Sequence, residues 1–162
     1  MADLEELLRR FVVNKVECVI VGGYAAMAHG ASLMTQDVDV CTHFSRPNLE
    51  RIYSAVADLH PYHFLTPQPL PLEIPPGFEN RINNLYIGTD IGRIDCLGNV
   101  LGVGDYATVL GQSIEVRLPI GAVRIINRRG LIKAKSAMDR PHDKIALIEL
   151  LAIEERRAPE PQ

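Results

Sequence analysis

The sequence lacks a hydrophobic run that approaches the roughly 18–20 residues needed for a membrane-spanning helix. Its first ten residues, MADLEELLRR, are acidic and amphipathic, without the apolar segment of a secretory signal peptide. The chain has only three cysteines, an odd number, and all stand in apolar stretches: Cys18, Cys41 and Cys96. These features argue against a disulfide framework and a cysteine zinc site, and they predict a cytoplasmic protein with reduced thiols and no membrane contact.

A strong surplus of one charge is also absent. Twenty acidic and 17 basic residues give a net charge of −3, so composition provides no global attraction to nucleic acid or to an anionic membrane. The 162 residues are 47% hydrophobic, which is enough for one globular domain with a sizeable core. We expect this single domain to cover residues 1–155 and the last residues, 156–162, to form a disordered tail.

The spacing of apolar residues predicts a domain that contains both helices and strands. The predicted helices cover residues 3–14, 24–29, 45–59, 105–110, 129–137 and 140–155, with Ser45 and Asp139 as N-terminal caps of the third and the last. The predicted strands cover residues 17–21, 36–42, 82–88, 91–97, 113–118 and 122–126. Residues 60–80 hold six of the eleven prolines and predict an irregular loop, either a lip for a second substrate or a cover for a sheet edge.

Two aspartates interrupt the apolar strand at residues 36–42, in the order Asp37-Val38-Asp39-Val40. Aspartate is depleted in strands, and two neighbouring carboxylates repel each other. Side chains two residues apart project from the same face of a strand, about 6.6 Å apart. This arrangement predicts a site for a hard cation such as Mg²⁺, which prefers carboxylate and phosphate oxygens.

Asp95 is the best candidate for a third carboxylate, because it interrupts the apolar strand at residues 91–97 in the same way. If this strand lies beside the strand at 36–42, the three aspartates share one surface. They could then hold two Mg²⁺ ions, and Asp95 could also accept the proton of an attacking hydroxyl. The alternative is that Asp37, Asp39 and Asp95 simply face solvent.

The glycine pair Gly22-Gly23 ends the first predicted strand and precedes the second predicted helix. Residues without Cβ let a chain turn sharply and bring backbone N–H groups close to a phosphate, and a helix N-terminus attracts anions. Together with the Asp-x-Asp pattern, the pair indicates a nucleoside triphosphate.

An apolar residue followed by Gly-Gly, a spacer of thirteen residues and Asp-apolar-Asp-apolar resembles the signature of the DNA polymerase β-like nucleotidyltransferase superfamily. The segments GGYAAMAHG, TQDVDV and IDCLG are similar to small bacterial proteins of the AbiEii-like and minimal nucleotidyltransferase groups. A loose C-terminal pattern formed by Lys135, Arg140 and Asp143 adds to this resemblance.

The resemblance implies an α/β (α+β) fold with a mixed β-sheet flanked by helices, which binds a nucleoside triphosphate and Mg²⁺. It implies the transfer of a nucleoside monophosphate to a hydroxyl acceptor with release of pyrophosphate. By match, Asp37 and Asp39 are metal ligands and Asp95 is the third carboxylate. Gly22 and Gly23 line the triphosphate, Lys135 approaches the nucleotide, and Asp143 is a further polar member of the site.

Two positions depart from the pattern of many relatives. Gly23 stands where they have serine, and Leu33 stands where they have arginine, so one hydroxyl and one cation of the phosphate site are missing. This leaves a second hypothesis open, in which the protein is a catalytically weak or inactive binding partner, for example one half of a toxin–antitoxin pair.

The acceptor also stays open between RNA, a protein and a small molecule. The chain is short for a drug-modifying enzyme, which usually has a further helical domain. Six basic residues and one acidic residue lie between Arg124 and Arg140, and they form either a solvated helix face or a basic wall for a triphosphate or a nucleic acid.

Overall fold

The computed structural model describes residues 2–157. The predicted disordered tail therefore falls largely outside the described residues, apart from Arg156, the last residue of the C-terminal helix, and Arg157. No helix among the described residues is both long and apolar enough to cross a bilayer.

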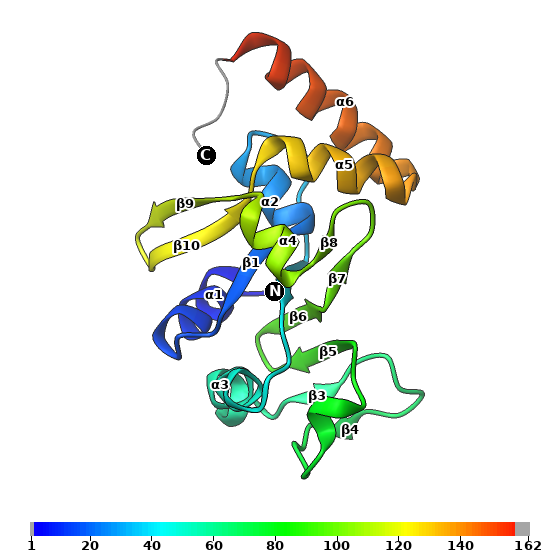
Figure 1. Ribbon diagram of the computed structural model, residues 1–162. Helices are drawn as coiled ribbons and strands as arrows, with labels where there is room; N and C mark the ends of the chain where they lie inside the picture. The colour runs from blue at the N-terminus through cyan, green and yellow to red at the C-terminus, as the bar shows by residue number, and fades with distance from the viewer. Residues whose placement is uncertain (1, 158–162) are drawn as a thin grey trace.

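An eight-stranded mixed sheet runs through the centre of the molecule, in the order β4-β3-β5-β6-β2-β1-β10-β9 (Figure 1). The pairs β2–β6 and β1–β10 are parallel, and the other neighbours are antiparallel. A separate hairpin pairs β7 with β8. The strands are β1 Cys18–Val21, β2 Asp37–Thr42, β3 Tyr62–His63, β4 Leu70–Pro71, β5 Asn84–Thr89, β6 Gly92–Leu97, β7 Asn99–Val100, β8 Gly104–Asp105, β9 Ser113–Leu118 and β10 Gly121–Ile126.

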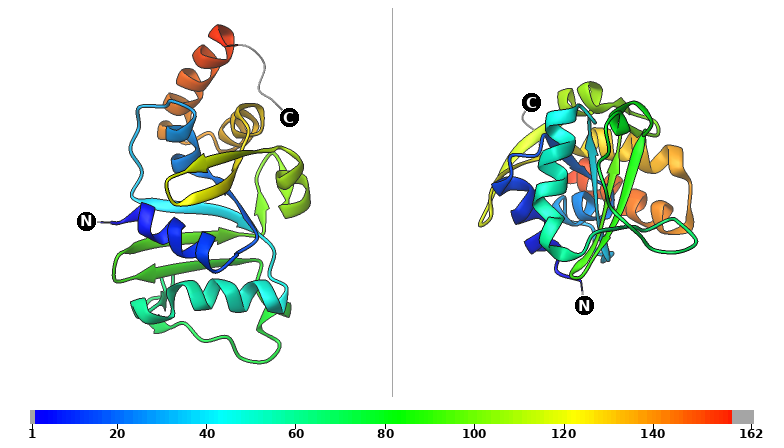
Figure 2. Two further views of the ribbon diagram at one scale, coloured as in Figure 1. Left: turned by 90° about the vertical axis from the view of Figure 1, so that its left-hand side faces the viewer. Right: turned by 90° about the horizontal axis from the view of Figure 1, so that it is seen from below.

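Helices lie on both sides of this sheet, as the resemblance implies. Helices α1 and α3 pack against each other on one side, and α5 and α6 form a second pair on the other (Figure 2). The α-helices are α1 Leu4–Val13, α2 Gly22–Ala28, α3 Arg46–Val56, α4 Tyr106–Gly111, α5 Arg128–Met138 and α6 Pro141–Arg156, and two 3₁₀ turns cover Ala57–Leu59 and Phe78–Asn80. The α/β class and the mixed sheet flanked by helices are confirmed.

The alternation of side chains along β2 decides which face becomes core. Val38 and Val40 are fully buried, in the same hydrophobic cluster as Leu8 of α1 and Ile52 of α3. Asp37 and Asp39 alternate with them and project from the opposite face of the sheet. The core of the sheet therefore forces both carboxylates onto the side of the sheet away from α1 and α3.

The structure corrects three of the predicted boundaries. Helix α2 begins at Gly22 and not at residue 24, so the glycine pair forms its first turn. Arg140 is the N-cap residue of α6, and Asp143 accepts its backbone N–H at 3.3 Å, because Asp139 adopts a left-handed conformation with φ of 55° and cannot cap the helix. Residues 60–80 are not entirely irregular, since they contain β3 and β4.

This proline-rich segment extends one edge of the sheet. Strand β3 pairs with β5, and the buried side chain of Leu72 anchors the segment after β4. The guanidinium of Arg46 donates hydrogen bonds to the carbonyl oxygens of Ile74 and Pro75 at 2.8 and 2.9 Å. Proline at position 71 is compatible with β4 because β4 is an edge strand, where a missing N–H costs little. The segment thus covers a sheet edge, which is one of the two roles predicted for it.

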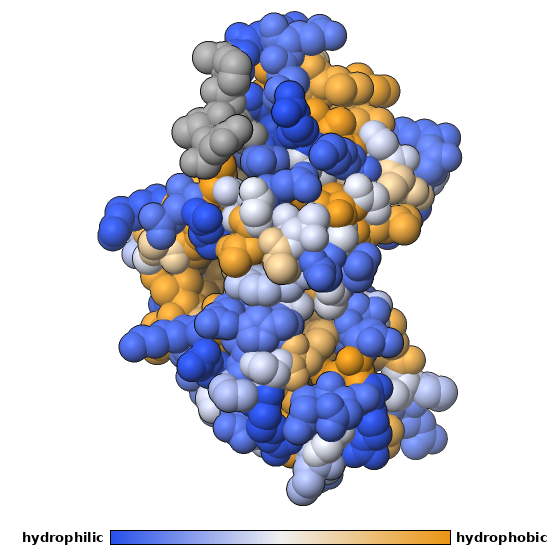
Figure 3. Space-filling model, in the orientation of Figure 1, coloured by the Kyte–Doolittle hydropathy of each residue, from blue (hydrophilic) through white to orange (hydrophobic). Residues whose placement is uncertain are grey.

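Helix α6 packs mainly against α5 and leaves part of its apolar surface exposed. Ile145, Ile148 and Leu151 are the exposed large hydrophobic residues of this helix. Hydrophobic surface is visible over the α5–α6 end of the molecule in Figure 3.

Candidate active site

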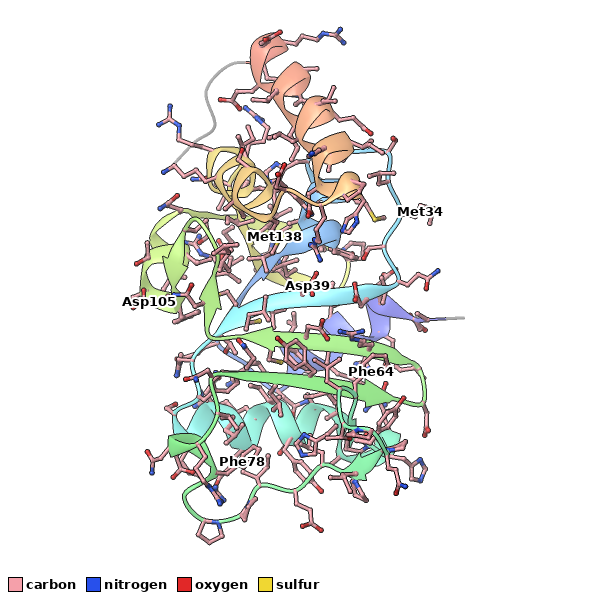
Figure 4. The ribbon with its side chains drawn as sticks, turned by 90° about the vertical axis from the view of Figure 1, so that its right-hand side faces the viewer. Met34, Asp39, Phe64, Phe78, Asp105 and Met138 are labelled. Carbon is pink, nitrogen blue, oxygen red and sulfur yellow. The ribbon has the colours of Figure 1, made fainter. Side chains whose placement is uncertain are left out.

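Three carboxylates meet where β2 and β6 run side by side. In the parallel register Asp39 is opposite Asp95, and Asp37 is opposite Arg93. One carboxylate oxygen from each of Asp37, Asp39 and Asp95 lies within 4.8 Å of the other two. The predicted neighbourhood of these strands is confirmed, and Figure 4 shows Asp39 between the sheet and the helices above it.

The carboxylates line a cavity of about 640 Å³. The sheet provides the acidic side, together with Tyr86 of β5, and α5 and α6 provide the opposite side with Lys135, Arg140 and His142. Gly22, Gly23 and the loop at residues 33–35 complete the lining. In Figure 4, Met34 and Met138 lie above Asp39, and Phe64 lies below it. The carboxylates of the sheet therefore face basic side chains of the helices, and Arg93 of β6 lies beside the carboxylates on the sheet side.

The electrostatics of the site reflect three acids held close together. Burial, together with the neighbouring Asp37 and Asp95, raises the pKa of Asp39 to about 7, and Lys135 and Arg93 offset only part of the effect. Burial also raises the pKa of Asp95, even though hydrogen bonds from Arg93 lower it. A divalent cation beside these oxygens would favour the charged form of Asp39 and so lower its pKa.

The two glycines make room for side chains of the acidic cluster. Gly22 has a φ of +66°, and a Cβ at this position would lie 2.2 Å from Oδ2 of Asp39. A Cβ at Gly23 would lie 2.8 Å from Cβ of Thr35 and 2.9 Å from its hydroxyl oxygen. The hydroxyl of Thr35 donates to Oδ1 of Asp37 at 3.0 Å. A hydroxyl is therefore present beside Gly23, the position at which the resemblance leads one to expect serine, and Thr35 supplies it.

Lys135 lines the cavity, whereas Asp143 lies behind it. The carboxylate of Asp143 is fully buried and accepts hydrogen bonds from Nζ of Lys135 at 3.0 Å and Nε of Arg140 at 2.6 Å. Burial would raise the pKa of Asp143, but the bonds from Arg140 and Lys135 outweigh it and lower the pKa to about 2. Asp143 thus holds two cations in position and is not itself among the residues that line the cavity.

Sequence reasoning missed Arg93 and Phe64. The guanidinium of Arg93 donates two hydrogen bonds to Asp95, from Nε to Oδ1 at 2.7 Å and from Nη2 to Oδ2 at 2.8 Å. Its other side stacks on the ring of Phe64, with 4.0 Å between Cζ and the ring centre. Arg93 precedes Asp95 by two residues in a strand, so period-two alternation could have placed both on one face. Phe64 could not have been found, because β3 was not predicted.

No protein-family model and no curated protein matches this sequence. Solved structures do match. The lincosamide antibiotic adenylyltransferase LnuA, solved with lincomycin bound, superposes with a TM-score of 0.61 over 94% of this chain and 98% of its own, at 14% identity. The chain has the nucleotidyltransferase fold.

Two structures of the antibiotic-resistance factor ANT(2'')-Ia are also similar, both at 14% identity. The solution structure has a TM-score of 0.59 and matches over 93% of this chain and 81% of its own. The complex with adenylyl-2''-tobramycin has a TM-score of 0.54 and matches over 95% and 96%. Since 98% of the LnuA chain is covered, an adenylyltransferase that acts on an antibiotic can be about as short as this chain, without the further helical domain that such enzymes were expected to have. The finer resemblance to AbiEii-like proteins stays a prediction.

Proposed function

We propose that this protein is a Mg²⁺-dependent nucleotidyltransferase, which transfers a nucleoside monophosphate from a nucleoside triphosphate to a hydroxyl acceptor. The observation that carries the proposal is the convergence of Asp37, Asp39 and Asp95 in one cavity of the nucleotidyltransferase fold. The fold neighbours support it, because they adenylylate antibiotics.

The residues present fit a hard divalent cation. The donor set is entirely carboxylate oxygen, which is the set that Mg²⁺ prefers. Gly22 leaves the space that the carboxylate of Asp39 needs to reach the cluster. Asp37, Asp39 and Asp95 would hold the metal, which we expect to be two ions. When bound, Mg²⁺ supplies positive charge that offsets the phosphates of the donor and stabilises the oxygens entering and leaving the reacting phosphorus.

Other residues of the cavity act on the donor and the acceptor. The backbone of Gly22 and Gly23 lines the triphosphate, and Lys135 and Arg140 direct positive charge towards it from the opposite wall. Asp95 accepts the proton of the acceptor hydroxyl while the hydroxyl oxygen bonds to the α-phosphorus. The bond from the α-phosphorus to the bridging oxygen then breaks, and pyrophosphate leaves. Most of the catalysis is positioning and charge neutralisation.

We infer that the acceptor is a small molecule. A nucleic-acid acceptor would favour a continuous exposed basic surface, and two of the six basic residues at 124–140 are instead buried in ion pairs. Arg128 is buried, and its Nε donates to Glu154 at 2.6 Å, while Lys135 is buried against Asp143. The fold neighbours bind lincomycin and adenylyl-tobramycin, which are small molecules.

The double variant Asp37→Asn/Asp39→Asn tests the proposal. Calorimetry measures binding of ATP, GTP, CTP and UTP with Mg²⁺, and pyrophosphate release is measured with a panel of hydroxylated antibiotics. The wild type should bind at least one nucleotide, and the double variant should lose metal-dependent binding and turnover. Glu115→Gln, on the distant strand β9, is the control.

Two outcomes would contradict this reading. Equal activity of the double variant and the wild type would show that these carboxylates do not hold the metal. If the wild type binds none of the four nucleotides, the second hypothesis, a catalytically weak binding partner such as half of a toxin–antitoxin pair, is favoured instead.

A further inference from the structure

The guanidinium of Arg93 is held between a carboxylate and an aromatic ring. Asp95 accepts two hydrogen bonds from it, one on each carboxylate oxygen, and the ring of Phe64 stacks against it. Arg93 also stands opposite Asp37 in the β2–β6 register, so it belongs to the acidic cluster and not to its periphery. A guanidinium paired in this two-pronged manner neutralises the carboxylate and fixes its orientation.

This pair competes with the proposed metal site. Asp95 is one of the three carboxylates that could ligate Mg²⁺, and Arg93 occupies both of its oxygens. A metal ligand must present a lone pair to the cation, and a positively charged guanidinium beside a divalent cation is repelled by it. Arg93 must therefore loosen its contact with Asp95 when the carboxylate turns to a metal.

The other two cations of the cavity have no comparable freedom. Lys135 and Arg140 both donate to Asp143, whose side chain is 0% exposed and which is not among the residues that line the cavity. Because the proposed reaction leaves Asp143 in place, both cations keep their partner throughout. The partner of Arg93, in contrast, is Asp95, which takes part in the proposed reaction.

We propose that Arg93 is a nucleotide-binding residue that exchanges partners: it neutralises Asp95 in the free protein and binds the phosphates of the donor once Asp95 ligates the metal. This inference rests on the function proposed above. It also assigns a source for the phosphate-binding cation that is absent at Leu33. The released guanidinium carries up to five N–H donors, which suit phosphate oxygens well.

Phe64 keeps the guanidinium at the cavity during this exchange. Its backbone N–H donates to the carbonyl oxygen of Tyr86 at 3.0 Å, which ties the proline-rich segment to β5 beside the site. Phe64 is 40% exposed, so a displaced guanidinium can move across its ring without entering the core. The proline-rich segment then both covers the sheet edge and, through Phe64, contacts Arg93 of the cavity lining.

Two titrations with opposite expected directions test the exchange. Mn²⁺ alone is titrated by electron paramagnetic resonance, and magnesium tripolyphosphate, which carries no base, is titrated by calorimetry at saturating Mg²⁺. In Arg93→Gln, Mn²⁺ should bind about threefold or more tightly, because a competing cation is gone. Tripolyphosphate should bind about tenfold to a hundredfold more weakly, because charged hydrogen bonds to phosphate are lost.

Further variants separate the contributions of charge, geometry and stacking. Arg93→Lys keeps the charge but loses the two-pronged contact, so both shifts should have the same signs and smaller sizes. Phe64→Leu should weaken tripolyphosphate binding about threefold, the order expected for one cation–π contact, with Mn²⁺ binding unchanged. Arg117→Gln removes an exposed arginine on β9 and should change neither titration.

The pattern of results identifies which proposal fails. If Arg93→Gln binds both probes as the wild type does, loses both, or gains affinity for both, the exchange is wrong while the proposed function stands. If the wild type itself binds neither Mn²⁺ nor tripolyphosphate, the metal site and the proposed function fail together. Should Arg93→Gln not fold, the paired shifts in Arg93→Lys and the tripolyphosphate shift in Phe64→Leu decide.

Discussion

Gly22 offers the sharpest test of why the site needs glycine, because the chain contains a matched control. Gly22 and Gly77 both have positive φ, +66° and +78°, so alanine at either position is strained by about 1–2 kcal/mol. A Cβ at Gly77 has no atom within 4 Å, whereas a Cβ at Gly22 would lie 2.2 Å from Oδ2 of Asp39. The difference between the two variants therefore isolates the collision with the carboxylate.

The collision has a predictable size. Relieving it requires the side chain of Asp39 to leave its position or α2 to shift, and overpacking of this kind costs about 1–3 kcal/mol. Gly22→Ala should then lower the free energy of unfolding by about 2–5 kcal/mol in total, and Gly77→Ala by only about 1–2 kcal/mol. For a chain of this length each kcal/mol corresponds to about 2–4 °C in Tm.

Urea denaturation measures both free energies of unfolding, and Mn²⁺ titration measures the site. Gly77→Ala should bind Mn²⁺ as the wild type does, while Gly22→Ala should bind it at least about tenfold more weakly, the effect of displacing one charged ligand. If Gly22→Ala is no less stable than Gly77→Ala and binds Mn²⁺ normally, the close approach of Asp39 to α2 is not required, and the reasoning fails.

Two further predictions concern the charged groups of the cavity. Asp143→Asn should lower the free energy of unfolding, measured in urea, by about 3–5 kcal/mol, because it leaves the buried Lys135 without its counter-ion. The double variant Lys135→Met/Asp143→Leu should recover most of the loss, and an equally unstable double variant would contradict this. In metal-free protein the pKa of Asp39 is about 7, above its unfolded value near 3.8, so the folded state binds more protons between these two pH values. The contribution of Asp39 to the free energy of unfolding is therefore fully present below about pH 3.8 and is lost as pH rises through 7. Asp39→Asn should remove this pH dependence, and a flat wild-type profile in EDTA would refute it.

Most of the fold follows from local patterns in the sequence. Helix α1 and strands β5 and β6 have regular apolar spacing and turn residues, and the predicted segments match the structure closely. The boundary of α2 was wrong because a glycine pair signals a turn as readily as it opens a helix. Strands β3 and β4 were missed since each has two residues and the segment is rich in proline, so their formation depends on pairing with β5 and not on local propensity.

The acidic half of the site was predictable because carboxylates in apolar strands are unusual and therefore noticeable. The cationic half was predicted only in part, because Lys135 was expected from the resemblance and Arg93 was missed. Period-two alternation places Arg93 on the face of Asp95, but only the register against β2 reveals that it lies opposite Asp37. Asp143 was expected by match alone to be a further polar member of the site, and its position behind Lys135 depends on how α5 packs against α6, which no local pattern encodes.

The charges of the cavity divide into units that are nearly neutral by themselves. Arg93 neutralises Asp95, and Asp143 carries Lys135 and Arg140 together, so one positive charge is left over on the α5–α6 side. Asp37 and Asp39 remain on the sheet, where burial, and after it the neighbouring carboxylates, raise the pKa of Asp39 to about 7. A polyphosphate with its divalent metal carries both signs of charge in one ligand. It can place the metal against the sheet and the phosphates against the helices, which neither a free metal ion nor a free phosphate can do. The arrangement therefore favours binding of metal and nucleotide together over either alone.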